Sequence, residues 1–162
     1  MKLGIPVMQK RGMTFLEVII VVTFFGILTA LVTPKLVTSL ESYKLDVTAK
    51  NLAQDLRNAQ SHAVETNSYT KLAFYVLADT YYVELSGKKD WTILPEGIII
   101  SSTTFQPVSL PTAGYTNLGS PSGGGGTVVL KNKYGDKVYV ITTPVNGRVR
   151  ISKSPPEHWD DY

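Results

Sequence analysis

The chain has 162 residues, which is enough for one membrane anchor and one domain of about 120 residues. It has no cysteine, so an extracytoplasmic domain must be held together by its core rather than by disulfide bonds. The formal net charge of +3 comes entirely from Lys2, Lys10 and Arg11, because the remaining chain has 13 basic and 13 acidic residues. This balance excludes general electrostatic binding of nucleic acid, although it leaves a local basic patch open.

The first predicted element is an apolar helix from Met13 to Val32, which contains one charged residue, Glu17. Twenty helical residues span about 30 Å, close to the hydrocarbon thickness of a bilayer. Lys10 and Arg11 precede the run, so the N-terminus is expected to stay cytoplasmic and the rest to lie outside. An unpaired carboxylate at the bilayer centre costs roughly 2.5–3.5 kcal/mol on insertion scales, which makes Glu17 a functional candidate.

The residues around this run carry a resemblance. A secretory signal peptide also begins basic and then turns apolar, but the residues after this run make a poor cleavage site. Lys10-Arg11-Gly12 followed by an apolar run with a glutamate resembles the class III leader of type IV pilins and pseudopilins. The resemblance implies that a prepilin peptidase cuts between Gly12 and Met13 and that Met13 is then methylated. An ordinary membrane anchor is the alternative.

The same resemblance gives Glu17 and Pro34 a role in subunit assembly, because they would occupy mature positions at which the family has a glutamate and often a proline. Once the leader is removed, Met13 has a free α-amino group that is positive near neutral pH. A neighbouring Glu17 can pair with that amine in a filament, which relieves the cost of a buried charge. In the monomer, Glu17 is expected to reach the cytoplasmic interface instead.

Beyond the span, the chain is expected to continue as an amphipathic helix. Pro34 removes a backbone hydrogen bond and is expected to kink the helix where it leaves the membrane. Apolar residues then recur at spacings of four and three, which is typical of a helix with one buried face. One long helix is therefore predicted from Met13 to about Glu65, ending before Asn67-Ser68. The apolar stripe consists of Leu45, Ala49, Leu52, Leu56, Ala59 and Ala63.

After Thr70 the apolar period changes from that of a helix to that of a strand, which predicts antiparallel strands. Residues 106–126, rich in Pro, Gly and Ser, are expected to form a structureless loop that is functional or mobile. The predicted strands are 72–76, 81–85, 91–93, 98–100, 127–131, 137–142 and 148–152. The predicted turns lie at Ala78-Asp79, Gly87-Lys88-Lys89-Asp90, Gly135-Asp136 and Asn146-Gly147.

A helix followed by strands predicts an α+β fold, in which a long N-terminal helix packs on an antiparallel β-sheet or β-sandwich head. The first half of that helix is expected to span the membrane and the second half to be amphipathic. The predicted divisions are a leader peptide (1–12), a transmembrane helix (13–34), its amphipathic extension (35–66), a β-rich head (67–154) and a loose tail (155–162).

Two further segments sharpen the resemblance. Leu94-Pro95-Glu96-Gly97 followed by isoleucines, and the segment 144–150, resemble the H-type minor pseudopilins of type II secretion and the FimT-like minor pilins. Their globular part is an antiparallel β-sandwich. The resemblance implies a structural subunit that waits in the cytoplasmic membrane and then enters a pilus or pseudopilus. Its implied partners are the prepilin peptidase, other pilins or pseudopilins, membrane lipid and an inner-membrane assembly platform.

The sequence has no recognisable active site. His62 lies one residue off the apolar stripe, without a second ligand at metal-binding spacing, and His158 lies in the loose tail. Each is interpreted as a solvent-facing or capping residue rather than as a metal ligand or a catalytic residue. Gly123–Gly126 lacks the Lys-Ser/Thr of a phosphate-binding loop and is interpreted as a flexible linker. We therefore expect no enzyme activity, no cofactor and no metal site.

One basic patch stands out between residues 131 and 153, with six cations and one anion. On a strand, Val149 and Ile151 are expected to face the core, while Arg148 and Arg150 share the outer face about 6.6 Å apart. FimT-like members include DNA-binding minor pilins with a similar Gly-Arg-x-Arg element, so a DNA-uptake role is the alternative function. Salt bridges within the sheet or to a neighbouring pilin are the competing explanation. The candidate DNA-contacting residues are Lys137, Arg148, Arg150 and Lys153.

Overall fold

The computed structural model describes residues 13–156, which fall into two compact units, one up to Val37 and one from Thr38 onward. A single helix, α1 (Phe15–Glu65), contributes to both units. The predicted long helix is therefore confirmed, and its C-terminal end lies at the predicted residue. We call residues 38–156 the head.

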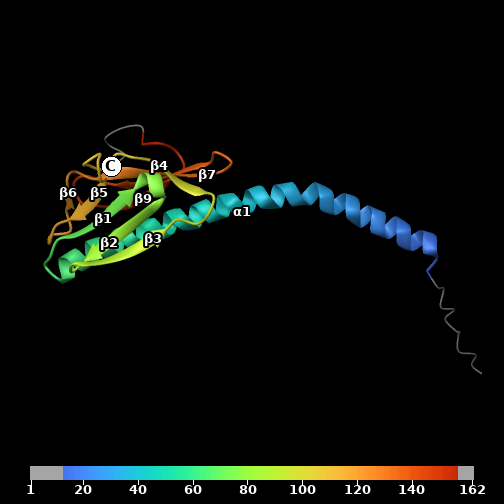
Figure 1. The fold of residues 1–162 in the computed structure, drawn as a ribbon, viewed down its shortest axis with the longest axis horizontal. Coiled ribbons are helices and arrows are strands. Elements are labelled where there is room, and N and C mark those ends of the chain that lie inside the picture. Colours follow the sequence, from blue (N-terminus) through green and yellow to red (C-terminus); the bar gives the residue numbers. More distant parts are fainter. Residues whose placement is uncertain (1–12, 157–162) are drawn as a thin grey trace, which may run out of the picture. The chain divides into compact units, whose positions relative to one another are not determined.

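The described part of the head contains nine strands in two antiparallel sheets, which confirms the predicted α+β fold (Figure 1). Sheet A has the strand order β3-β2-β1-β5-β6, and sheet B has the order β4-β7-β8-β9. The elements after α1 are β1 (Thr70–Tyr75), the 3-10 turn η1 (Val76–Ala78), β2 (Thr80–Leu85), β3 (Lys88–Ile93), β4 (Ile98–Thr103), β5 (Thr112–Tyr115), β6 (Pro121–Ser122), β7 (Gly126–Asn132), β8 (Lys137–Thr142) and β9 (Val149–Ser152).

The core of the head lies between α1 and the inner faces of both sheets. All six residues of the predicted helix stripe are buried, and Ala53, which the sequence analysis left out, is buried with them. Phe74 of β1 stacks on Phe105 at 5.6 Å between ring centroids, which links sheet A to the segment after β4. The residues that the two sheets add to the core include Leu72, Phe74, Tyr81, Ile98, Ile100, Val128, Leu130, Val138, Val140 and Val149.

The end of α1 is joined directly to the first strand. Asn67 adopts a left-handed backbone with φ of 49°, and the Ser68 amide donates to the Ala63 carbonyl at 3.1 Å. A left-handed residue just past the last turn is a common way to stop a helix. The buried Thr70 hydroxyl then donates to the Ala59 carbonyl at 2.8 Å. The chain therefore reverses at once, and β1 starts beside the helix.

The predicted turn Gly87-Lys88-Lys89-Asp90 is wrong in its extent. The turn between β2 and β3 has two residues, Ser86 and Gly87, with φ of 49° and 80°. Lys88 already pairs with Leu85, so β3 contains the charged residues that the sequence analysis placed in the turn. Charged residues on an edge strand have the same composition as a turn, which explains the error.

The expectation of a structureless loop over residues 106–126 is also wrong. This segment contains β5, which pairs with β1, and β6, which pairs with β5. Tyr115 is fully buried in the core, and Ala113 is nearly so. Strands of four and two residues are too short for an alternating pattern to reveal them.

Candidate functional site

Glu17 lies in the first turn of α1, within the unit of residues 13–37. The Glu17 amide donates to both the hydroxyl (3.3 Å) and the carbonyl (3.1 Å) of Thr14. A threonine followed three residues later by a glutamate is the sequence signature of a helix N-cap, which the sequence analysis missed. A negative charge in the first turn is also favoured by the helix dipole. Glu17 therefore helps to stabilise the first turn of the helix, independently of any role in subunit assembly.

The unit of residues 13–37 exposes large apolar side chains around the helix, including Phe15, Leu16, Phe24 and Phe25. Among residues 13–156, α1 is the one helix long and apolar enough to cross a membrane. No residue of its most apolar stretch is buried. A helix that is apolar on every side needs an apolar environment around it.

Three threonines in this unit satisfy their hydroxyl groups within the helix. Thr23, Thr29 and Thr33 each donate to the carbonyl four residues earlier, at 2.8 Å. Such bonds remove the cost of a free hydroxyl in lipid. Glu17 is the only ionisable side chain from Met13 to Val32. The helix runs unbroken through Pro34, and the predicted kink there stays a prediction.

The predicted cleavage site is only partly visible. Gly12 and the rest of the predicted leader lie outside the described residues, as do His158 and most of the predicted tail. Met13 is described, and it is exposed two residues before α1 begins. Cleavage between Gly12 and Met13 and methylation of Met13 remain predictions.

The four candidate DNA-contacting residues lie at different points along β8 and β9. Arg148 precedes β9 and Lys153 follows it, so they are about 16 Å apart along an extended chain. Lys153 and Lys137 line one concavity together with Asp46, and the Lys153 ammonium lies 3.3 Å from the Asp46 carboxylate. Arg148 is exposed, whereas Arg150 is half-buried. Lys153 is therefore paired with a carboxylate, and the role of all four cations in binding DNA remains a prediction.

One part of the predicted strand pattern is wrong. Val149 is buried as expected, but Ile151 is 38% exposed and is not part of the core. β9 has four residues and, within residues 13–156, pairs with β8 alone at the edge of sheet B. The core covers the beginning of this edge strand, near Val149, and leaves its end open to solvent.

A polar clasp, which we define as Glu41, Ser42, Lys44, Lys133 and Asp136, joins α1 to the β7–β8 turn. Glu41 accepts hydrogen bonds from Lys44 at 3.1 Å, and its carboxylate lies 3.2 Å from the Lys133 ammonium. Ser42 donates to Asp136 at 2.8 Å. The hydrogen bond from Lys44, with help from Lys133, lowers the pKa of Glu41. The hydrogen bond from Ser42 is the main reason that the pKa of Asp136 is also lowered.

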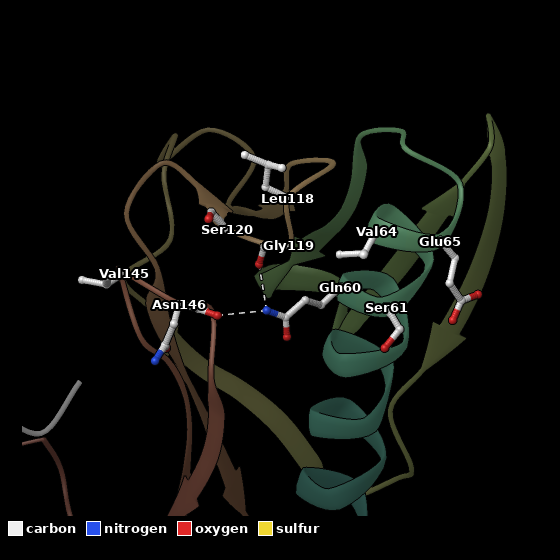
Figure 2. A pocket seen from close by; sticks show the side chains of 9 residues that line it. All are labelled: Gln60, Ser61, Val64, Glu65, Leu118, Gly119, Ser120, Val145 and Asn146. Atoms are coloured by element: carbon white, nitrogen blue, oxygen red, sulfur yellow. Dashed lines mark hydrogen bonds between the residues drawn. The ribbon is translucent and has the colours of Figure 1, made fainter.

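At the other end of the head segment of α1, a concavity of about 540 Å³ lies between the helix, the β5–β6 turn and the β8–β9 loop (Figure 2). Gln60 bridges the two loops, because its amide nitrogen donates to the carbonyls of Gly119 (2.7 Å) and Asn146 (3.0 Å). Exposed Leu118 and Val145 lie on its rim. Gln60 therefore holds the two loops beside the end of the helix.

His62 lies in the last turn of α1, where its Nδ1 is 3.4 Å from the Thr66 hydroxyl. This position is consistent with a capping role. Within the described residues, no three His, Cys, Asp or Glu side chains are grouped so that they could hold a metal ion.

Comparisons with solved structures find the same fold in two proteins of bacterial filaments. The minor pseudopilin EpsH from the type 2 secretion system of Vibrio cholerae matches with a TM-score of 0.54 and 15% identity, over 67% of this chain and 96% of that one. The type IV minor pilin FimU of Pseudomonas aeruginosa matches with a TM-score of 0.54 and 14% identity, over 74% and 97% of the two chains. The chain therefore has the fold of minor pilins and pseudopilins.

No protein-family model matches the chain, and no curated protein sequence matches it either. The likeness therefore rests on the arrangement of the helix and the two sheets rather than on shared sequence.

Proposed function

We propose that this chain is a structural subunit, a minor pilin or pseudopilin, of a type IV pilus or a type II secretion filament. It is made as a precursor in the cytoplasmic membrane, with its N-terminus in the cytoplasm and its head outside. A prepilin peptidase removes residues 1–12, and Met13 is methylated. The subunit is then transferred, through the inner-membrane assembly platform, into a filament with other pilins.

The observation that carries this proposal is the combination of two units in one chain. A head with the minor pilin fold follows a helix that exposes apolar side chains around its surface. The apolar stretch has one carboxylate, four residues after Met13. Neither unit alone would point to a filament, because apolar anchors and β-rich heads occur separately in many proteins.

Glu17 supplies the assembly step. After cleavage, the Met13 amine of one subunit and the Glu17 carboxylate of another are opposite charges inside an apolar helical bundle. Pairing them offsets the cost of burying each one, whereas either alone would be strongly destabilising there. Glu17 therefore favours the register in which the Met13 amine of a new subunit lies beside the Glu17 carboxylate of its neighbour.

Glu17→Gln tests this role, because it keeps the size of the side chain and removes the charge. We expect the variant to be cleaved normally and to stay in the membrane, with its incorporation into sheared filaments reduced at least ten-fold. Thr23→Val is the matched control, since it changes a polar group of the same helix without changing charge, and it should assemble as the native chain does. Immunoblots of sheared filaments measure incorporation, and immunoblots of membrane fractions measure cleavage and retention in the membrane.

The processing step has its own test. Mass spectrometry of the native mature protein is expected to find methylated Met13 as the first residue, and Gly12→Asp to leave the first twelve residues in place. A mature chain that retains those residues would overturn the proposal. Normal assembly of Glu17→Gln would overturn the role of the carboxylate alone.

A further inference from the structure

The outer face of sheet A carries three rows of side chains, which follow from the register of β1, β2 and β3. Two strand pairings place Lys71 opposite Glu84 and Glu84 opposite Lys89. The next row on the same face is Ala73, Tyr82 and Trp91, and the third is Tyr75, Thr80 and Ile93. The face therefore changes along the strands from a charged row to two largely uncharged rows that contain Tyr82, Trp91, Tyr75 and Ile93.

The aromatic side chains of this face form a cluster of their own. Trp91 lies 5.0 Å from Tyr82 and 5.4 Å from Tyr75 between ring centroids. The Lys89 ammonium lies over the Tyr82 ring at 4.7 Å. Tyr82 is buried by these neighbours but is not part of the main core. Trp91 and Ile93, by contrast, are 53% and 77% exposed. Large exposed aromatic and aliphatic side chains held by a rigid sheet are typical of a docking surface.

The backbone beside this cluster is an open strand edge. In the described part of the chain, β3 is the first strand of sheet A and pairs only with β2. A two-residue hairpin makes Leu85 and Lys88 a hydrogen-bonded pair, and the pattern then alternates. The Leu94 amide, which donates to the Asp79 carbonyl at 3.0 Å, agrees with this alternation. The backbone amides of Lys89, Trp91 and Ile93 therefore point away from β2.

We propose that β3 accepts an extended segment of a partner protein as an additional antiparallel strand of sheet A. Every strand pair of this sheet is antiparallel, which sets the direction of the added strand. Its alternate side chains would then meet Ile93, Trp91 and Lys89 in that order. The matching sequence is apolar-x-apolar-x-acidic, read from its N-terminus.

Charge complementarity selects the acidic residue of that segment. Lys71 pairs with Glu84 at 3.3 Å, which leaves Lys89 as the cation at the open edge of the charged row. Charged residues on an edge strand normally discourage pairing with other chains. In β3, only Lys88, Lys89 and Asp90 are charged. The second half of the strand, Trp91-Thr92-Ile93, has no charged residue that would discourage pairing. A segment without an acidic residue would give the Lys89 ammonium no ion-pair partner beyond the edge, whereas an acidic one gains an ion pair.

The proposal goes beyond filament assembly, because it uses the head and not the apolar helix. It is tested with the full chain in phosphatidylcholine nanodiscs and a fluorescein-labelled peptide with the core Val-Thr-Phe-Thr-Glu. We expect saturable binding by fluorescence anisotropy, at least ten-fold tighter than that of a scrambled peptide. Trp91→Thr combined with Ile93→Thr should weaken binding at least ten-fold. Val145→Thr, in the β8–β9 loop of sheet B, where Val145 is 85% exposed, is the matched control and should leave binding unchanged.

A charge exchange makes the test independent of any folding defect. Lys89→Glu should weaken binding of the acidic peptide and strengthen that of a peptide with lysine in place of its glutamate. Strand addition also predicts that hydrogen exchange at the amides of Lys89, Trp91 and Ile93 slows at least ten-fold on binding. Equal binding of the scrambled peptide, no effect of the double substitution, or unchanged exchange would each overturn the proposal. Binding of oligothymidylate or a soluble oligosaccharide in place of the peptide would also overturn it.

Discussion

Gly126, at the start of β7, lies so close to Phe105 that there is no space for a side chain. A Cβ at this position would lie 2.7 Å from the Phe105 ring, which is itself buried against Phe74. Gly126→Ala must therefore displace a core aromatic ring, and we expect it to lower the free energy of unfolding by about 1–3 kcal/mol. Urea denaturation of the full chain in detergent, followed by near-UV circular dichroism, measures this loss.

The double variant Gly126→Ala with Phe105→Leu is the control. A smaller side chain at position 105 gives the new methyl group some space, so the two substitutions together should cost less than the sum of their separate effects. Strict additivity, or an unchanged Gly126→Ala protein, would show that the ring is not the obstacle.

For single residues, burial could be predicted from the sequence where apolar residues recur at a regular spacing, and not elsewhere. The helix stripe from Leu45 to Ala63 was predictable because seven-residue spacing is a property of one helix. Ile151 was predicted wrongly, since alternation along a strand does not tell where an edge strand runs beyond the core. Tyr115 is fully buried, but its neighbours in sequence are glycine, threonine and asparagine, so nothing local marked it.

Helix α1 stabilises the head mainly through its apolar stripe, and Leu56 is fully buried in it. Leu56→Ala should lower the free energy of unfolding by about 2–5 kcal/mol, because it leaves a cavity between the helix and the sheets. Lys50→Ala, on an exposed part of the same helix, should change it by no more than about 0.5 kcal/mol. Chemical denaturation of both proteins distinguishes packing from helix propensity, and similar losses would contradict the packing argument.

The polar clasp makes the attachment of α1 sensitive to acid. Glu41 and Asp136 have pKa values below their ordinary values of 4.5 and 3.8, so the folded protein takes up protons less readily than the unfolded chain. Their contribution to stability is full above these ordinary values and is lost as the pH falls through the lowered ones. Unfolding between about pH 3 and 7 should show this loss, and Glu41→Gln should reduce its slope.

Glu65→Gln removes one negative charge from the same helix outside the clasp and is therefore the matched control. A slope that is the same in the native protein and in Glu41→Gln would show that the clasp carries none of the acid sensitivity.

Short elements were the least predictable. β5 forms against β1 and β6 forms against β5, and pairing between distant segments has no signature in either segment alone. The boundary of β3 was misplaced for a related reason. Lys88 and Lys89 are tolerated in a strand because β3 is at the edge of sheet A, and sheet order is a property of the whole fold.

For the whole molecule, the positions of the candidate DNA-contacting cations decide which substitutions should weaken DNA binding most. Arg148 is exposed at one end of β9, and Lys153 lies at the other end beside Asp46. Charge reversal of Arg148 together with Arg150 is therefore expected to abolish any salt-dependent binding of duplex DNA in gel shifts. Lys153→Glu should have a smaller effect. Absence of binding by the native chain, or an equal loss with Lys153→Glu, would contradict the prediction.

The general architecture was predictable from the order of patterns, since an apolar run, an amphipathic stripe and alternating strands each have their own period. The division of nine strands into two sheets was not. It depends on β1 lying between β2 and β5, and on β4 pairing with β7 across the segment that contains β5 and β6.

The hydrogen bonds of three threonines in the unit of residues 13–37 affect the proposed transfer of the subunit from lipid into a filament. Because Thr23, Thr29 and Thr33 keep their hydroxyl bonds inside the helix, these groups have nothing to gain or lose when lipid tails are exchanged for protein neighbours. In the transfer from lipid to filament that we propose, the free-energy change of the segment from Met13 to Val32 is then dominated by side-chain packing and by the Glu17 carboxylate. The amine of one neighbouring subunit is then the group that would change the balance at Glu17 in the proposed assembly.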